Sequence, residues 1–185
     1  EKEFPAMGKN QAEVLAPLFN RLSPLLIKPL TRQVVGQART TIPMRQMIDA
    51  GLLILVDVSS NNPEIGDKNA SVLGMMLVNA IWGAAKSRVK GSATCPTYLW
   101  IDEFHLFVTK DIEKMLAEAR GFGVGVNVAT QFWGQLPDYM QEALLNNAWT
   151  KLVGRINSAE EAKKAIGIFR GKQMDVGSLM GLPKY

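Results

Sequence analysis

Short apolar runs alternate with amphipathic stretches along most of this 185-residue chain. Four of the runs have the length of buried strands, and turn or helix signals separate them. The predicted strands cover residues 52–58, 98–102, 124–130 and 150–156. Regular alternation of strands with helices predicts an α/β fold, in which helices flank a parallel sheet.

The predicted helices lie before and between these strands. Residues 1–50 read as a helical lead-in segment, whose first helix over residues 10–27 should bend or split at Pro17 and Pro24. Further helices are predicted after Pro29, over 44–50, from 67 to the break at 91–96, over 111–120, over 137–147 and over 158–168. In the last of these, Ser158 is expected to cap the helix and Glu161 to complete a capping box.

The helix that begins at Asp67 contains the longest apolar stretch of the chain, residues 70–85. This stretch is slightly short for a bilayer and includes Asn79, so the sequence favours a buried helix. The stripe expected to face inward consists of Val72, Leu73, Met76, Leu77, Ala80, Ile81 and Ala84.

Composition narrows the chemistry that the chain can perform. With 47% hydrophobic residues the chain can bury a core, as one globular domain or part of one. Its net charge of +4 is compatible with binding to nucleic acid, but the basic residues are spread along the sequence. A single cysteine, Cys95, excludes an internal disulfide and a cysteine zinc site, and a single histidine, His105, excludes a multi-histidine metal site. Carboxylates, amides and arginines are left to carry any reaction.

Two adjacent acids, Asp102 and Glu103, end the predicted strand 98–102. Ligands of open α/β sheets bind at the carboxyl edge, and neighbouring residues of a strand point to opposite faces. This is the Walker B pattern, in which Asp102 would hold hydrated Mg²⁺ through its water shell and Glu103 would polarise the water that attacks a terminal phosphate. An ordinary strand exit into a solvated helix cap is the plainer alternative.

A polar amide follows the next predicted strand, where Gln131 would lie beside the two acids if the strands are neighbours. Gln131 could then hydrogen-bond the attacking water or the phosphate, as a sensor does. The alternative is a loop glutamine that satisfies backbone groups.

Several stretches resemble the FtsK/HerA superfamily of motor ATPases, and most of all the type IV secretion coupling proteins of conjugation (TraG/TraD-like). They read YLWIDEFH, EARGFGVGVNVATQFWGQL and NNAWTKLVGRINSAEEA, preceded by PMRQMIDAGLLILVDVSS and GDKNASVLGMMLVNAIWGAAKSR. The resemblance covers residues 42–169 and implies a RecA-like P-loop NTPase fold. By it, residues 1–185 would form the C-terminal part of one ATPase domain, carrying the Walker B acids and the sensor.

The resemblance also implies roles for single residues. Asp102, Glu103 and Gln131 match the Walker B acids and the sensor, and Arg120 matches an arginine finger that acts on a neighbouring subunit's nucleotide. The competing interpretation of Arg120 is a helix C-terminal arginine that complements the helix dipole. Arg155 lies where relatives often carry an arginine after an aromatic residue, but Gly154 precedes it here.

A phosphate-binding loop of the form Gly-x-x-x-x-Gly-Lys-Ser/Thr does not occur in the sequence. In the resembling family this loop lies upstream, as do the membrane helices where present, so the chain is expected to be cut from a longer protein and to be inactive alone. The cluster Gly121, Gly123 and Gly125 precedes a predicted strand and is therefore not a dinucleotide fingerprint.

The implied cofactors are ATP and Mg²⁺, and the implied assembly is a hexameric ring at the cytoplasmic face of the bacterial inner membrane. DNA translocation in conjugation is the favoured function, with DNA and relaxosome-type accessory proteins as partners. Two alternative functions stay open: a protein-secretion ATPase, and a non-hydrolytic docking module for a DNA-bound accessory protein. A helicase with an Asp-Glu-x-His box is disfavoured, because the residues around Gln131 differ from the usual helicase motif. Trp133 and Tyr139 are expected to pack.

Overall fold

The computed structural model describes residues 11–58, 63–92, 95–169 and 175–183. These residues form two compact units, each described by itself. The first unit comprises Glu1–Pro43 and Leu53–Leu77, and the second comprises Met44–Leu52 and Val78–Tyr185. Helices dominate both units, and the strands belong to the second.

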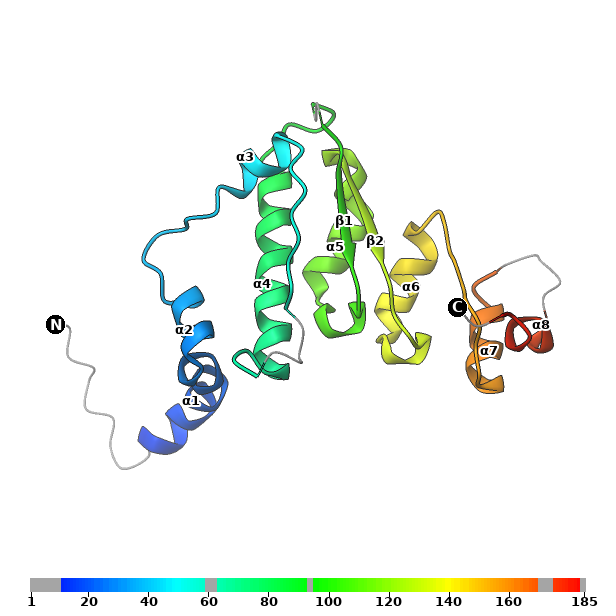
Figure 1. The fold of residues 1–185 in the computed structure, drawn as a ribbon, viewed down its shortest axis with the longest axis horizontal. Helices are drawn as coiled ribbons and strands as arrows, with labels where there is room; N and C mark the ends of the chain where they lie inside the picture. The colour runs from blue at the N-terminus through cyan, green and yellow to red at the C-terminus, as the bar shows by residue number, and fades with distance from the viewer. Residues whose placement is uncertain (1–10, 59–62, 93–94, 170–174, 184–185) are drawn as a thin grey trace. The chain divides into compact units, whose positions relative to one another are not determined.

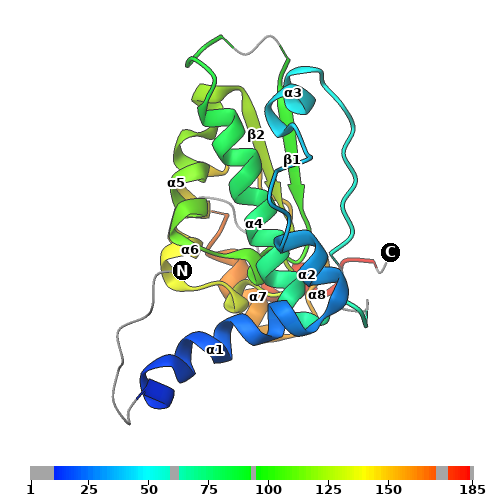
Figure 2. The same ribbon diagram turned by 90° about the vertical axis from the view of Figure 1, so that its left-hand side faces the viewer.

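The first unit is built from α1 (Gln11–Ile27), α2 (Pro29–Val35) and the first turns of α4 (Asp67–Lys86). Asn69 connects them, since its buried side-chain amide donates to the carbonyl of Pro24 at 2.9 Å and to the hydroxyl of Thr31 at 3.4 Å. Figure 2 shows α2 next to the end of α4 at which that helix begins. The prolines do not split the first helix, because α1 continues through Pro17 and Pro24, and the alternative of a bend stays a prediction. Asn10, the predicted first residue of that helix, lies outside the described residues.

Residues 52–58 do not form the predicted strand. They are irregular, and the side chains of Leu53 and Leu55 are 86% and 85% exposed. A strand is stabilised by backbone hydrogen bonds to a neighbouring strand, and no strand of the described chain pairs with this run. An apolar run is therefore a necessary condition for a buried strand but not a sufficient one.

The predicted inward stripe of α4 is also wrong. Among its members, Met76 is 51% exposed and Ala80 is exposed, whereas the buried apolar side chains of the helix are Ala70, Val78, Trp82 and Ala85. The helix is apolar around its whole circumference, so periodicity alone could not select the face that packs.

Two parallel strands organise the second unit: β1 (Thr97–Ile101) and β2 (Val124–Val128). Thr97 is paired with Val124 and Ile101 with Val128, so both strands end at the same edge (Figure 1). Two of the four predicted strands are thus confirmed, within one or two residues at their ends. The larger RecA-like sheet of the sequence prediction remains a prediction.

Helices and 3₁₀ turns surround this strand pair. Their bounds are α3 (Met44–Asp49), η1 (Phe104–Phe107), α5 (Lys110–Glu118), η2 (Ala119–Phe122), η3 (Trp133–Gln135), α6 (Asp138–Asn147), α7 (Ala159–Ile166) and α8 (Val176–Met180). The most deeply buried apolar side chains, each at most 1% exposed, include Phe104, Ile112, Met115 and Met140. Phe104 directly follows the acid pair, so the core anchors the loop that carries the candidate site.

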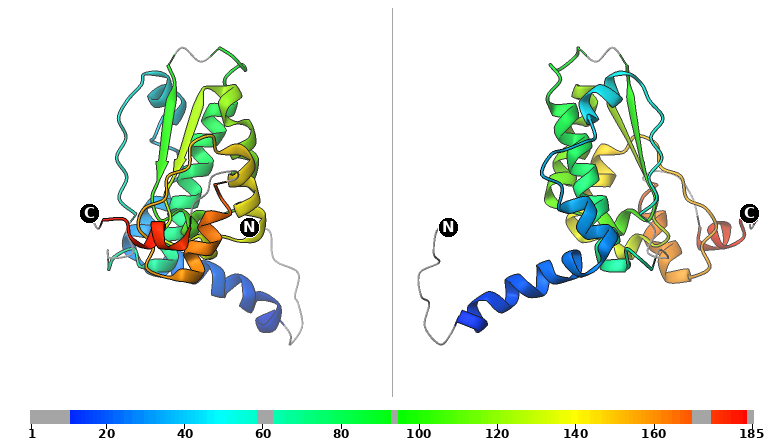
Figure 3. Two further views of the ribbon diagram at one scale, coloured as in Figure 1. Left: turned by 90° about the vertical axis from the view of Figure 1, so that its right-hand side faces the viewer. Right: turned by 60° about the vertical axis from the view of Figure 1, so that its left-hand side comes forward.

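The carboxyl-terminal helices have a small core of their own. Ala162 and Ala165 of α7 pack with Leu179 of α8, and the two helices lie side by side (Figure 3). Ser158 caps α7 as predicted, but the Glu161 carboxylate pairs with Lys164 at 2.9 Å, and the structure records only the Ser158 half of the capping box.

The predicted strand over residues 150–156 is wrong, because this run is irregular in the structure. Leu152 is 92% exposed, although Val153 and Ile156 pack against the small core of α7 and α8. No strand of the described residues pairs with this run, while some of its apolar side chains still pack against neighbouring helices.

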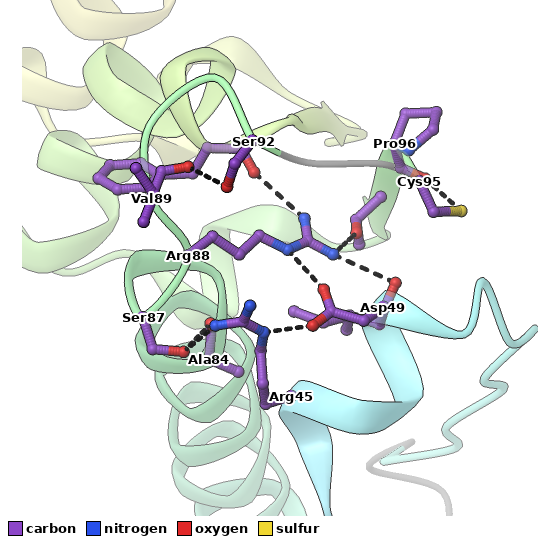
Figure 4. Close-up of polar contacts among 12 residues, drawn as sticks. Arg45, Asp49, Ala84, Ser87, Arg88, Val89, Ser92, Cys95 and Pro96 are labelled. Atoms are coloured by element: carbon purple, nitrogen blue, oxygen red, sulfur yellow. Dashed lines mark hydrogen bonds and ion pairs between the residues drawn. The ribbon is translucent and has the colours of Figure 1, made fainter.

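Arg88 joins α3 to the strand pair (Figure 4). Its side chain is 2% exposed, and its guanidinium donates to Asp49 Oδ1 at 2.9 Å and to the carbonyls of Phe122 and Ile48 at 3.1 and 3.2 Å. A fourth bond, of 3.1 Å, reaches the hydroxyl of Thr97 at the start of β1. Four of the five guanidinium N–H groups therefore have an acceptor, one of them a carboxylate, as a stable buried arginine requires.

Candidate functional site

Two backbone hydrogen bonds fix the loops that follow β1 and β2. The amide of Ala129 donates to the carbonyl of Ile101 at 2.9 Å, and the amide of Phe104 donates to the carbonyl of Ala129 at 2.8 Å. Asp102 and Glu103 must therefore turn the chain within two residues, between two anchored positions. The turn places the acid pair beside the loop that carries Gln131.

Glu103 has an unusual backbone conformation. Its φ of 46° and ψ of 45° lie in the left-handed region, and it is the one non-glycine residue with positive φ in the part of the chain that the structure describes. This region costs an L-residue other than glycine roughly 1–2 kcal/mol. Strained residues of this kind cluster at functional sites, where the surrounding structure holds them in place.

The Glu103 carboxylate lies between two side chains. The amide nitrogen of Gln131 donates a short hydrogen bond to Oε1, and Nδ1 of His105 lies 3.4 Å from Oε2. The Glu103 side chain is 37% exposed, so the carboxylate is accessible to water and to a ligand. The structure thus brings Glu103 and Gln131 together, as the sequence predicted for neighbouring strands.

Asp102 is exposed at the same edge, and its Oδ1 accepts a hydrogen bond of 2.8 Å from the backbone amide of Glu103. Within the described ranges, no group of three or more His, Cys, Asp or Glu side chains is arranged to hold a metal ion directly. Mg²⁺ usually keeps several of its waters and binds proteins through one or two carboxylates together with substrate phosphates. A solvent-facing carboxylate such as Asp102 fits that kind of site.

Arg120 does not join the other three predicted site residues. It lies in η2, before β2, whereas Gln131 follows the other end of that strand. Its guanidinium carbon is 5.8 Å from the ring centre of Trp149, an exposed side chain. A role on a neighbouring subunit's nucleotide remains a prediction.

The sequence assigned no role at the site to Trp133, Tyr139 and Arg155, which follow the acid pair by some distance in sequence. Tyr139 of α6 is half-buried, and the ammonium of Lys110 lies 3.7 Å from its ring centre. Trp133 is partly buried in η3, and Arg155 is exposed in the irregular run after α6. The contact of Tyr139 agrees with the expectation that it packs within the chain.

His105 is the residue that sequence reasoning missed at this site. The sequence excluded multi-histidine chemistry, and the Asp-Glu-x-His spacing was weighed only as a helicase box. The Asp-Glu-x-His spacing was the available signal, because a tight turn of two residues after Glu103 brings the imidazole back toward its carboxylate. The helical turn η1 supplies that geometry, with Leu106 N donating to Glu103 O at 2.9 Å.

No helix in the described part of the chain is long and apolar enough to span a membrane. The expected placement at the inner membrane therefore stays a prediction from the resemblance.

Comparison with known proteins gives one family match. Residues 96–168 match the family model described as the TraM recognition site of TraD and TraG. The matched segment contains β1, the acid pair, Gln131 and Arg120. No curated protein and no solved structure matches the chain.

Proposed function

We propose that this chain is the Walker B and sensor portion of an ATP-driven coupling protein that moves DNA in conjugation. The observation that carries the proposal is the cluster at the shared edge of β1 and β2. There a strained Glu103, an exposed Asp102 and Gln131 lie together inside the segment that matches the TraD and TraG family.

Each residue would have a separate task in ATP hydrolysis. Asp102 would hold hydrated Mg²⁺ through its waters, and the bound ion would neutralise charge on the phosphates. Glu103 would orient and polarise the attacking water, which requires a carboxylate that is exposed but fixed in direction. Gln131 already donates to Glu103 Oε1, so it would hold the carboxylate in place and contact the water or phosphate when a nucleotide binds.

Two parts of the machinery would come from outside a single copy of this chain: the phosphate-binding loop, and the arginine that reaches its nucleotide from a neighbouring subunit. The phosphate-binding loop would be supplied by the full-length protein, since its motif does not occur in these 185 residues. Arg120 lies at the opposite end of β2 from Gln131, so it would act on the nucleotide of a neighbouring subunit in a hexameric ring. The DNA cargo and the ring are proposals that follow from the coupling-protein role.

The test is Mg-ATP hydrolysis by the full-length protein without DNA, with single-stranded DNA and with double-stranded DNA, at one stated salt concentration. We expect DNA to stimulate turnover and Glu103→Gln to lower kcat by about 10²–10⁴-fold, the range of a lost general base. Glu118→Gln is the matched control, because it removes an exposed carboxylate from α5, away from the site.

Turnover that survives Glu103→Gln would overturn the catalytic assignment. Hydrolysis that does not respond to DNA would instead favour a protein-secretion ATPase, the alternative that keeps the same site.

A second candidate function is docking of a DNA-bound accessory protein, and the description of the matching family favours it. Two large apolar side chains in the matched segment are nearly fully exposed, Trp149 at 90% and Leu152 at 92%. Exposed aromatic and aliphatic side chains of this kind often anchor protein interfaces.

Calorimetric titration of the chain with purified TraM tests this candidate. We expect Leu152→Ser to weaken binding by about tenfold, the effect of an interface residue that contributes about 1.4 kcal/mol. Leu53→Ser is the control, since Leu53 is 86% exposed but lies outside the matched residues. Equal effects of both substitutions, or no binding at all, would contradict docking through this surface.

A further inference from the structure

His105 lies next to the acid pair, but the proposed reaction gives it no role. It is the only histidine of the chain, and η1 carries it next to Glu103. The imidazole is mostly buried, with 19% of the side chain exposed. Its buried nitrogen, Nδ1, therefore requires an explanation.

Nδ1 of His105 is the one buried side-chain nitrogen or oxygen without a hydrogen-bond partner in the described part of the chain. Leaving such an atom unsatisfied costs about 1–3 kcal/mol, so a buried polar atom normally has a partner within reach. Oε2 of Glu103 lies 3.4 Å from it. A contraction of a few tenths of an ångström would make this contact a hydrogen bond, and such bonds at catalytic residues often tighten only when the substrate binds.

The other oxygen of the same carboxylate already accepts a hydrogen bond from Gln131. A carboxylate held through both oxygens cannot rotate about its terminal bond. Because the backbone of Glu103 is itself held in the left-handed region, the direction of its side chain is then determined from both ends. Three otherwise unexplained features therefore converge on one carboxylate: the backbone strain, the Gln131 bond and the unsatisfied imidazole nitrogen.

We propose that His105 is a positioning residue, whose Nδ1–H donates to Oε2 of Glu103 while Gln131 holds Oε1. In this arrangement the imidazole is neutral, with its proton on Nδ1, and it touches neither the phosphate nor the attacking water. The contact itself is a property of this fold, whereas its effect on catalysis rests on the proposed function. Two experiments separate these parts.

The first experiment is ¹⁵N NMR of the imidazole in this chain, at a pH where histidine is neutral. With one histidine in the sequence, the spectrum contains one imidazole and needs no assignment. An imidazole in water prefers the proton on Nε2, whereas the proposed bond requires it on Nδ1. We expect the Nδ1–H tautomer in the natural sequence and a shift toward Nε2–H in Glu103→Gly, which removes the acceptor.

Glu118→Ala serves as the control, since it removes an exposed carboxylate elsewhere and should leave the tautomer unchanged. A predominant Nε2–H tautomer in the natural sequence would overturn the proposal without any variant. An Nδ1–H tautomer that persists in Glu103→Gly would also overturn it, because another acceptor would then hold the proton.

The second experiment compares His105→Asn with His105→Gln in the full-length protein. The asparagine amide nitrogen can occupy the place of Nδ1, whereas the glutamine amide nitrogen can reach only the place of Nε2. We expect His105→Asn to keep kcat within about threefold and His105→Gln to lower it about tenfold at an unchanged KM for ATP, because a misdirected group costs rate and not binding.

Equal kcat values in both variants would remove the positioning role. Absence of ATP turnover in the natural full-length protein would instead contradict the proposed function, and the NMR result would still decide whether His105 holds Glu103.

Discussion

Arg88 and Glu103 are both charged residues next to the same pair of strands, but their surroundings differ. Arg88 is 2% exposed and donates four hydrogen bonds of ordinary length, one of them to Thr97 at the start of β1. Glu103 follows the other end of β1, is 37% exposed, has a left-handed backbone and lies beside an unsatisfied imidazole nitrogen.

The difference shows that the charge of Arg88 is structural, whereas the charge of Glu103 is available for chemistry. Every acceptor around Arg88 belongs to the fold and none is left for a ligand, so the network can only stabilise. At Glu103 the fold holds a strained backbone and leaves the carboxylate exposed to solvent, which is typical of functional sites. Substitutions should therefore act in opposite directions at the two places.

The largest effect on stability is expected for Arg88→Met. The substitution keeps much of the side-chain volume but leaves the carbonyls of Ile48 and Phe122 and the hydroxyl of Thr97 without their donor. At about 1 kcal/mol or more for each unsatisfied group, the free energy of unfolding should fall by about 3 kcal/mol. Urea denaturation followed by circular dichroism measures this change.

Arg45→Met is the matched comparison. Arg45 also pairs with Asp49, but its side chain is 44% exposed, so solvent replaces the lost contacts. A loss as large as that of Arg88→Met would show that the burial of Arg88 is not what matters.

A smaller effect of opposite sign is expected for Glu103→Gly. Glycine adopts the left-handed conformation without the steric cost of a side chain, so the chain should become more stable by about 1 kcal/mol even though the bond to Gln131 is lost. The same urea experiment measures the gain. In the full-length protein this variant should nevertheless be inactive.

Gly123→Ala gives the converse case, because Gly123 has a φ of 71° and alanine there should cost about 1 kcal/mol. If both variants were destabilised alike, the backbone of Glu103 would not be strained in solution.

The smallest effect concerns pH. The hydrogen bond from Arg45 holds the pKa of Asp49 below its ordinary value of 3.8, against the raising effect of burial and with further help from Arg88. A carboxyl group whose pKa is lower in the folded state contributes stability above its unfolded pKa, and this contribution is lost as the pH falls through the folded value. Stability should therefore decline below pH 3.8, and less steeply in Asp49→Asn.

Urea midpoints measured from about pH 5 to about pH 2.5 would show the difference in slope. Some acid dependence should persist in Asp49→Asn, because the hydrogen bond from Lys164 also lowers the pKa of Glu161. Identical slopes in both proteins would mean that Asp49 has no altered pKa in the folded chain.

The sequence predicted the strand pair β1 and β2 better than the apolar runs before and after it. Strands β1 and β2 were found because each apolar run ends in a clear turn signal, and the Ser158 cap was found because capping is local. Residues 52–58 and 150–156 have the same apolar pattern but remain irregular. Whether an apolar run becomes a strand depends on a partner distant in sequence, which no local pattern reports.

For the candidate site, the sequence alone determined which chemistry was possible. The acid pair, the amide after the next strand and the lack of further histidines already indicated carboxylate chemistry at one sheet edge. Only the tertiary structure decided that Gln131 contacts Glu103, that Arg120 lies at the other end of β2, and that His105 turns toward the carboxylate. Residue types and spacings limit the reactions available to a chain, but the distances between side chains arise when parallel pairing and core packing join segments distant in sequence.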